Sequence, residues 1–86
     1  MAQKESLSVI VNGTAYAIEA NLEAPVLVVV EKALKDSGNQ GQPPQNWELR
    51  DAAGNLLDLQ KKLEDYHLPN GAKLFLSLKA GVGGSV

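Results

Sequence analysis

The sequence predicts a single α+β domain in which one helix packs across a mixed sheet of four to five strands, in the chain order β-β-α-β-β-β. Three observations support this fold class. Alternating segments flank an Asn-Gly pair near the N-terminus, a central segment repeats its apolar residues at helical spacing, and further alternating segments follow. A chain of 86 residues has the length of one domain, and such elements pack as a helix layered on a sheet.

The first two strands are predicted over residues 7–12 and 14–20. The letters "LSVIVN" are rich in β-branched residues, and "TAYAIEA" alternates larger and smaller side chains. Asn12 and Gly13 join the two segments. This dipeptide is the strongest short hairpin signal, because a type I′ turn needs positive φ at both central residues.

Two interpretations compete for residues 25–37. The run Val-Leu-Val-Val-Val has high β-propensity. Against a strand, Pro25 suits the first turn of a helix, Gly38 suits its end, and Lys35 lies where the helix dipole favours positive charge. The apolar residues at helical spacing are Val26, Val29, Val30, Ala33 and Leu34. We therefore predict a helix over residues 25–37.

Three more strands are predicted, over residues 47–51, 56–59 and 72–79, with a polar loop over 38–46. One face of each strand and one stripe of the helix should form a single core. The residues expected to face inward are Leu7, Val9, Val11, Val26, Val30, Ala33, Leu34, Leu49, Leu57, Leu63, Leu68, Leu74, Leu76 and Leu78. Trp47, which shares a strand face with Leu49, is expected in the same core.

The same alternation places other side chains on the open face of the sheet. Ile10 on the first strand and Phe75 and Ser77 on the last are expected there. Two interpretations stay open: an ordinary scattering of exposed apolar residues, or an apolar spot that binds a partner. Phe75 is the only phenylalanine of the chain, and its exposure would favour an apolar spot that binds a partner.

Composition excludes several classes of function. The net charge is −2 with scattered basic residues, so a nucleic-acid binder is not expected. The chain has no cysteine, and its single histidine, His67, has no companion for a metal site, so we expect neither metal nor cofactor. No signal peptide or membrane-spanning segment is evident, and a cytoplasmic location is expected. No catalytic constellation is evident, and we expect a protein that is not an enzyme.

The C-terminal third of the sequence resembles ubiquitin and the ubiquitin-like β-grasp modifiers. The residues that carry the resemblance are Leu63, Asp65, Tyr66, Leu68, Leu74, Leu76, Leu78, Lys79, Gly83 and Gly84. The early hairpin and the order of elements agree with it along nearly the whole chain. The stretch "WELRDAAGNLLDL" is closer to bacterial ubiquitin-like proteins, which suggests a modifier from a bacterial ubiquitination-like operon, some of which act in anti-phage defence.

The resemblance implies a role for the C-terminal end of the chain in conjugation. It divides the sequence into a disordered N-terminus (1–5), a β-grasp domain (6–79) and a flexible tail (80–86). In the family the terminal glycine carboxylate is adenylated with ATP, passed to a cysteine and joined to an amine. This implies an activating enzyme, a conjugating enzyme, a processing or deconjugating protease and target amines as partners. Conjugation is expected through Gly84, beside Gly83, after a cut that removes Ser85-Val86.

From Lys79 to Gly84 an extended tail spans about 20 Å, enough to enter a partner's active site. The residues expected to line that channel are Lys79, Ala80, Gly81 and Val82. Glycine lacks Cβ and lets the backbone approach closely, although small residues near an end also suit a frayed terminus without a role. A bulky side chain at either Gly83 or Gly84 should block the channel.

The resemblance is incomplete on the open sheet face. Arg50 and Ser77 occupy two sites where ubiquitin has an aliphatic recognition patch, so ubiquitin's own readers are not expected to bind. Together with Ile10 and Phe75 they form the expected partner surface. Two alternatives to a modifier remain: a sulfur carrier with a thiocarboxylate on its terminal glycine, and a ubiquitin-like binding module that is never conjugated.

Overall fold

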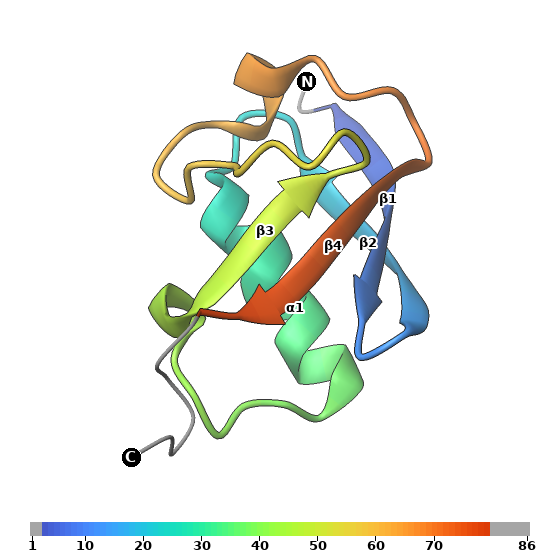
Figure 1. Cartoon of the computed structure of the whole chain (residues 1–86). Coiled ribbons are helices and arrows are strands. Elements are labelled where there is room, and N and C mark those ends of the chain that lie inside the picture. Colours follow the sequence, from blue (N-terminus) through green and yellow to red (C-terminus); the bar gives the residue numbers. More distant parts are fainter. Residues whose placement is uncertain (1–2, 80–86) are drawn as a thin grey trace.

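The computed structural model describes residues 3–79, which form one sheet with a helix across one face (Figure 1). The strands and the helix are β1 (Lys4–Val11), β2 (Thr14–Asn21), α1 (Val26–Ser37), β3 (Trp47–Asp51) and β4 (Ala72–Leu78). The short 3-10 helices are η1 (Pro44–Asn46) and η2 (Leu63–Tyr66). The sheet order is β2-β1-β4-β3, with β1 and β4 parallel at its centre and the outer pairs antiparallel. The predicted fold class is confirmed.

The hairpin between β1 and β2 turns at the predicted dipeptide. Asn12 has φ 52° and Gly13 has φ 84°, the positive values that a type I′ turn requires. The hairpin is longer than predicted, because Lys4 pairs with Asn21 and Glu5 with Ala20. The expectation of disorder over residues 1–5 is therefore wrong for Lys4 and Glu5, which the ladder of β2 holds in a strand.

Helix α1 confirms the helical interpretation of the valine-rich segment. Gly38 ends it in the left-handed conformation (φ 75°), and the Asn39 N–H donates to the Leu34 carbonyl over 2.8 Å, as in a Schellman motif. At the other end, the first N–H groups of a helix have no partner within it. Here the Val26 N–H donates to the Lys61 carbonyl over 2.8 Å and the Leu27 N–H to the Leu59 carbonyl over 3.0 Å.

These bonds explain why the predicted strand over residues 56–59 is wrong. The segment makes one isolated bridge, between Arg50 and Leu56, and one bond from the Leu57 N–H to the Leu49 carbonyl (2.8 Å). Beyond that point its carbonyl at Leu59 serves the N-terminus of α1 instead of a strand partner. The sheet consequently has four strands in the described residues, not five.

The core lies between the sheet and α1. Its buried residues are Leu7, Val9, Val11, Ile18, Ala20, Val26, Val29, Val30, Ala33, Leu34, Trp47, Leu49, Leu57, Leu63, Leu74 and Leu76. Leu68 is partly buried and packs against this cluster. The expectation that Leu78 is buried is wrong, since its side chain is 39% exposed. Leu78 is the last residue of β4, at the end of the sheet, where it lines an open groove beside the loop after α1.

Candidate functional site

The open face of the sheet carries a row of three expected partner residues on three neighbouring strands. Ile10 of β1 is the register partner of Phe75 of β4, and Phe75 is in turn the partner of Arg50 of β3. Phe75 is 41% exposed and Arg50 is also exposed, while Ile10 is half-buried between its two neighbouring strands. The structure therefore brings an apolar spot and a cation together on one surface.

Arg50 is held in place by two neighbours. Its guanidinium donates to Glu48 Oε2 at 2.9 Å and to the Gly54 carbonyl at 3.2 Å. Glu48 is the register partner of Ser77, so the exposed hydroxyl of Ser77 lies across from the carboxylate. These contacts leave further guanidinium N–H groups for a partner, because arginine carries five donors. The surface therefore differs in chemistry from a purely aliphatic patch.

The tail leaves the fold at a defined point. The Lys79 N–H donates to the carbonyl of Asn46 at the end of η1 over 2.9 Å, and the Asn46 side chain donates to Gln42 Oε1 over 2.8 Å. This bond fixes the last described residue beside β3. The other tail residues singled out in the sequence lie outside the described residues: Ala80, Gly81, Val82, Gly83, Gly84 and Ser85.

A groove runs along the outer side of β3 and ends at the start of the tail. We call it the root groove; its lining residues are Gln45, Trp47, Glu48, Leu56, Leu57, Asp58, Leu59, Gln60 and Lys79. Figure 1 shows η1 and the loop after β3 on this same outer side of β3. Leu56 on its wall is 56% exposed, more than any other large apolar side chain in residues 3–79.

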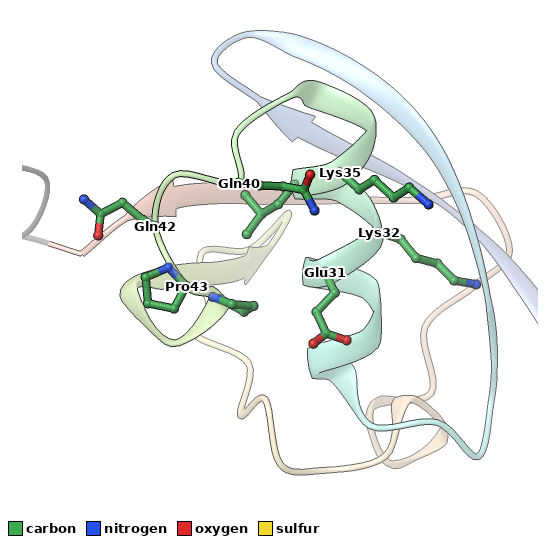
Figure 2. Close-up of a pocket in the computed structure, with 8 residues that line it drawn as sticks. Glu31, Lys32, Lys35, Gln40, Gln42 and Pro43 are labelled. Atoms are coloured by element: carbon green, nitrogen blue, oxygen red, sulfur yellow. The ribbon is translucent and has the colours of Figure 1, made fainter.

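A second groove lies between α1 and the loop that follows it (Figure 2). Leu34 is buried in its lining, and Pro43 and Pro44 form the opposite wall. Figure 2 shows Lys32 and Lys35 pointing away from Pro43; the Lys32 ammonium donates to the Glu19 carbonyl of β2. The lining of this groove combines two proline rings and two glutamine amides with the charged side chains of Glu31, Lys32 and Lys35.

The turn after β3 positions Leu56. Asp51 Oδ1 accepts hydrogen bonds from the Ala53 and Asn55 N–H groups, each at 2.9 Å, and the Asn55 N–H bond is the main reason that the pKa of Asp51 lies below its ordinary value of 3.8. A carboxylate whose folded pKa is lowered stabilises the fold above its unfolded pKa, and that contribution disappears as pH falls through the folded value.

We therefore expect the turn over residues 51–55 to loosen below about pH 4. The amide hydrogen exchange of Asn55, followed by NMR against pH and corrected for intrinsic exchange, should accelerate as Asp51 takes up a proton. An Asp51→Asn variant should show faster exchange at neutral pH and lose the pH dependence. Exchange in the unaltered protein that stays flat down to pH 2 would contradict this assignment of the turn.

Two side chains fix the chain around η2 by accepting hydrogen bonds from the backbone. The Asp65 carboxylate accepts the Lys62 N–H at 3.2 Å, and the Tyr66 hydroxyl accepts the Asp58 N–H at 2.7 Å, so both fix the local chain. His67 is exposed in this loop. Within residues 3–79, no three His, Asp or Glu side chains are arranged to hold a metal ion. In that same part of the chain, α1 is too short to cross a membrane.

Comparison with known proteins places the chain in a family. Residues 2–84 match the family described as "Protein of Unknown function (DUF2604)". The chain belongs to the DUF2604 family. A curated relative, the uncharacterized protein y4jI of Sinorhizobium fredii, is 49% identical over 82 residues. That match takes in 95% of this DUF2604 chain and 63% of the relative, so the chain spans less than two thirds of the relative's length.

Solved structures similar to the DUF2604 chain share one fold. A de novo designed protein based on ubiquitin has a TM-score of 0.77 at 18% identity, covering 95% of this chain and 96% of the design. Caldiarchaeum subterraneum ubiquitin has a TM-score of 0.74 at 22% identity, covering 95% of this chain and all of that one. The ubiquitin-like domain of an Arabidopsis thaliana protein has a TM-score of 0.73 at 18% identity, covering 91% of this chain and 80% of that one. The DUF2604 chain has the ubiquitin-like β-grasp fold.

Sequence reasoning found the open-face residues but missed the root groove of the DUF2604 chain. Alternation along each strand predicts that Ile10 and Phe75 face outward, and the resemblance to ubiquitin adds Arg50 to the same surface. The sequence places Leu57 in the core, which leaves Leu56 outside, and the structure agrees. The predicted strand over residues 56–59 hides the groove that this segment forms with Lys79. The signal available was the turn-forming stretch Asp51–Asn55 before it, which ends the alternation.

Proposed function

We propose that this DUF2604 protein is a ubiquitin-like modifier that becomes joined to amines of target proteins through the carboxyl group of Gly84. The observation that supports the proposal most is the point at which the described fold gives way to the tail. In a ubiquitin-like fold, β4 ends at Leu78, Lys79 is tied to Asn46, and the chain continues within five residues to Gly84. The family match covers residues 2–84, a range that includes Gly83 and Gly84, while Ser85-Val86 lie beyond it.

The chemistry requires a free Gly84 carboxylate. A protease hydrolyses the peptide bond between Gly84 and Ser85, with water supplying the hydroxyl, and releases Ser85-Val86. The carboxylate then attacks the α-phosphorus of ATP on an activating enzyme, and pyrophosphate leaves. A partner thiol displaces AMP to form a thioester, and a target amine displaces that thiol to form the amide. In every step the chain is a substrate of partner enzymes and not itself an enzyme.

We propose the open sheet face as the surface that contacts the activating and conjugating enzymes. An exposed Phe75 supplies apolar area, and the fixed guanidinium of Arg50 favours a partner with a nearby carboxylate. Because ATP-dependent activation takes place where ATP is abundant, we propose the cytoplasm as its location. The narrower proposal of a bacterial ubiquitination-like operon with an anti-phage role requires neighbouring genes for an activating enzyme, a conjugating enzyme and a protease.

Covalent adducts in cells test the proposal. An N-terminally tagged protein, expressed in its natural host, should give bands of higher mass that survive boiling in detergent with thiol reductant, because an amide persists where a thioester is cleaved. The bands should require the partner genes. If the tagged protein migrates only as the free chain when all partner genes are expressed, the modifier proposal is wrong.

A further inference from the structure

Two exposed leucines line neighbouring grooves beside the point where the tail leaves the fold. Of the three large apolar residues that are most exposed within residues 3–79, Phe75 and Leu78 belong to β4, and Leu56 lies beside β3 as the bridge partner of Arg50. Leu56 lines the root groove, and Leu78 lines a neighbouring groove; Trp47 is a wall of both. Exposed apolar groups grouped at one place commonly mark a protein contact.

The exposed position of Leu56 is fixed by its surroundings. The preceding turn is tied by Asp51, whose N–H donates to the Asn55 carbonyl at 3.0 Å, and the following Leu57 is buried and donates its N–H to the Leu49 carbonyl. Arg50 and Leu56 form a β-bridge. Binding of a partner to Leu56 therefore requires little further ordering of this segment, and the low entropic cost favours affinity.

One wall of the root groove contains a buried polar atom without a hydrogen-bond partner. Trp47 is 5% exposed, and its indole Nε1 is buried without an acceptor in the described structure. The lining also includes Glu48, which is paired with Arg50, together with Asp58 and Lys79. A partner that fits these features brings an apolar side chain to Leu56 and a basic side chain to Asp58.

We propose that the root groove is a docking surface for the protease that cuts after Gly84, with an apolar side chain of the protease resting against Leu56. This inference rests on the proposed function. Lys79 is itself a wall of the groove and the residue from which the tail departs, with five residues between it and the Gly84 bond. A protease that binds this segment must lie within about 20 Å of the groove. Contact with the groove is then intramolecular once the tail is bound, and it strengthens binding.

Cleavage rates in a lysate of the natural host, read by mass spectrometry as loss of Ser85-Val86, test the inference. The substrates are the whole chain, a Leu56→Gln variant, a Leu56→Met variant, a Lys35→Gln variant and a synthetic peptide of residues 79–86. Leu56→Gln should lower kcat/KM about tenfold, because one apolar contact with the protease is lost. The peptide lacks the groove and should be cut no faster than this variant. Leu56→Met should restore most of the rate, and Lys35→Gln, on α1, should match the unaltered chain.

Each result is decisive. Slower cleavage of Leu56→Gln and of the peptide, with unchanged near-ultraviolet circular dichroism of the variant, supports docking at the root groove. Equal rates for the peptide and every variant overturn the inference and leave the modifier proposal standing, because the tail is then recognised alone. No cleavage of any substrate after Gly84 overturns the inference and the processing step together.

Discussion

Replacing Gly84 with aspartate is expected to reduce conjugation about a hundredfold or more, since a misplaced reacting carboxylate costs at least that factor. The new Cβ and carboxylate would enter a channel shaped for bare backbone and would oppose approach to the ATP phosphates. The measurement is ATP-pyrophosphate exchange with the activating enzyme, together with adduct formation in cells.

A matched glycine replacement separates this effect from any general effect of a new carboxylate. Gly41 lies in the loop after α1, and a Cβ added there meets nothing within 4 Å. Gly41→Asp should therefore form adducts as the unaltered chain does. If Gly84→Asp conjugates at the rate of Gly41→Asp, residue 84 need not be glycine, and the inference of a narrow channel around it is wrong.

Truncating Leu74 to alanine is expected to lower the free energy of unfolding by about 2–5 kcal/mol. Leu74 lies in the middle of β4 with no exposed area, where its side chain contributes to the single core. For a domain this small, whose total stability is of order 5–15 kcal/mol, that loss is a large share. Urea unfolding followed by the fluorescence of Trp47, the only tryptophan, measures it directly.

Leu56 supplies the control for this measurement, because it carries the same side chain in an exposed position. Leu56→Ala should change the unfolding free energy by no more than about 0.5 kcal/mol. Similar losses at both positions would contradict the assignment of Leu74 to the core and of Leu56 to the surface.

The parts of the fold that sequence reasoning predicts are those set by local chemistry. The Asn12-Gly13 turn needs positive φ, and Gly38 ends a helix in the left-handed region; both requirements are visible in the residue types. Pro25, Gly38 and the apolar spacing predict the valine-rich helix in spite of its β-propensity, and the structure confirms it.

The parts that escaped prediction depend on contacts between distant segments. Residues 56–59 have strand-like composition, yet Leu59 gives its carbonyl to the N-terminus of α1, a demand that no local pattern reveals. Leu78 continues the alternation of β4, but burial also requires a covering layer, and that depends on where the neighbouring loop lies.

The most direct test of the modifier proposal is peptide mass spectrometry on tagged protein isolated from its natural host. After digestion, the account predicts a branched peptide in which the Gly84 carbonyl is joined by an amide bond to a lysine amine of another protein. A thiocarboxylate on Gly84, or the free chain alone with the activating enzyme, the conjugating enzyme and ATP all present, would contradict it.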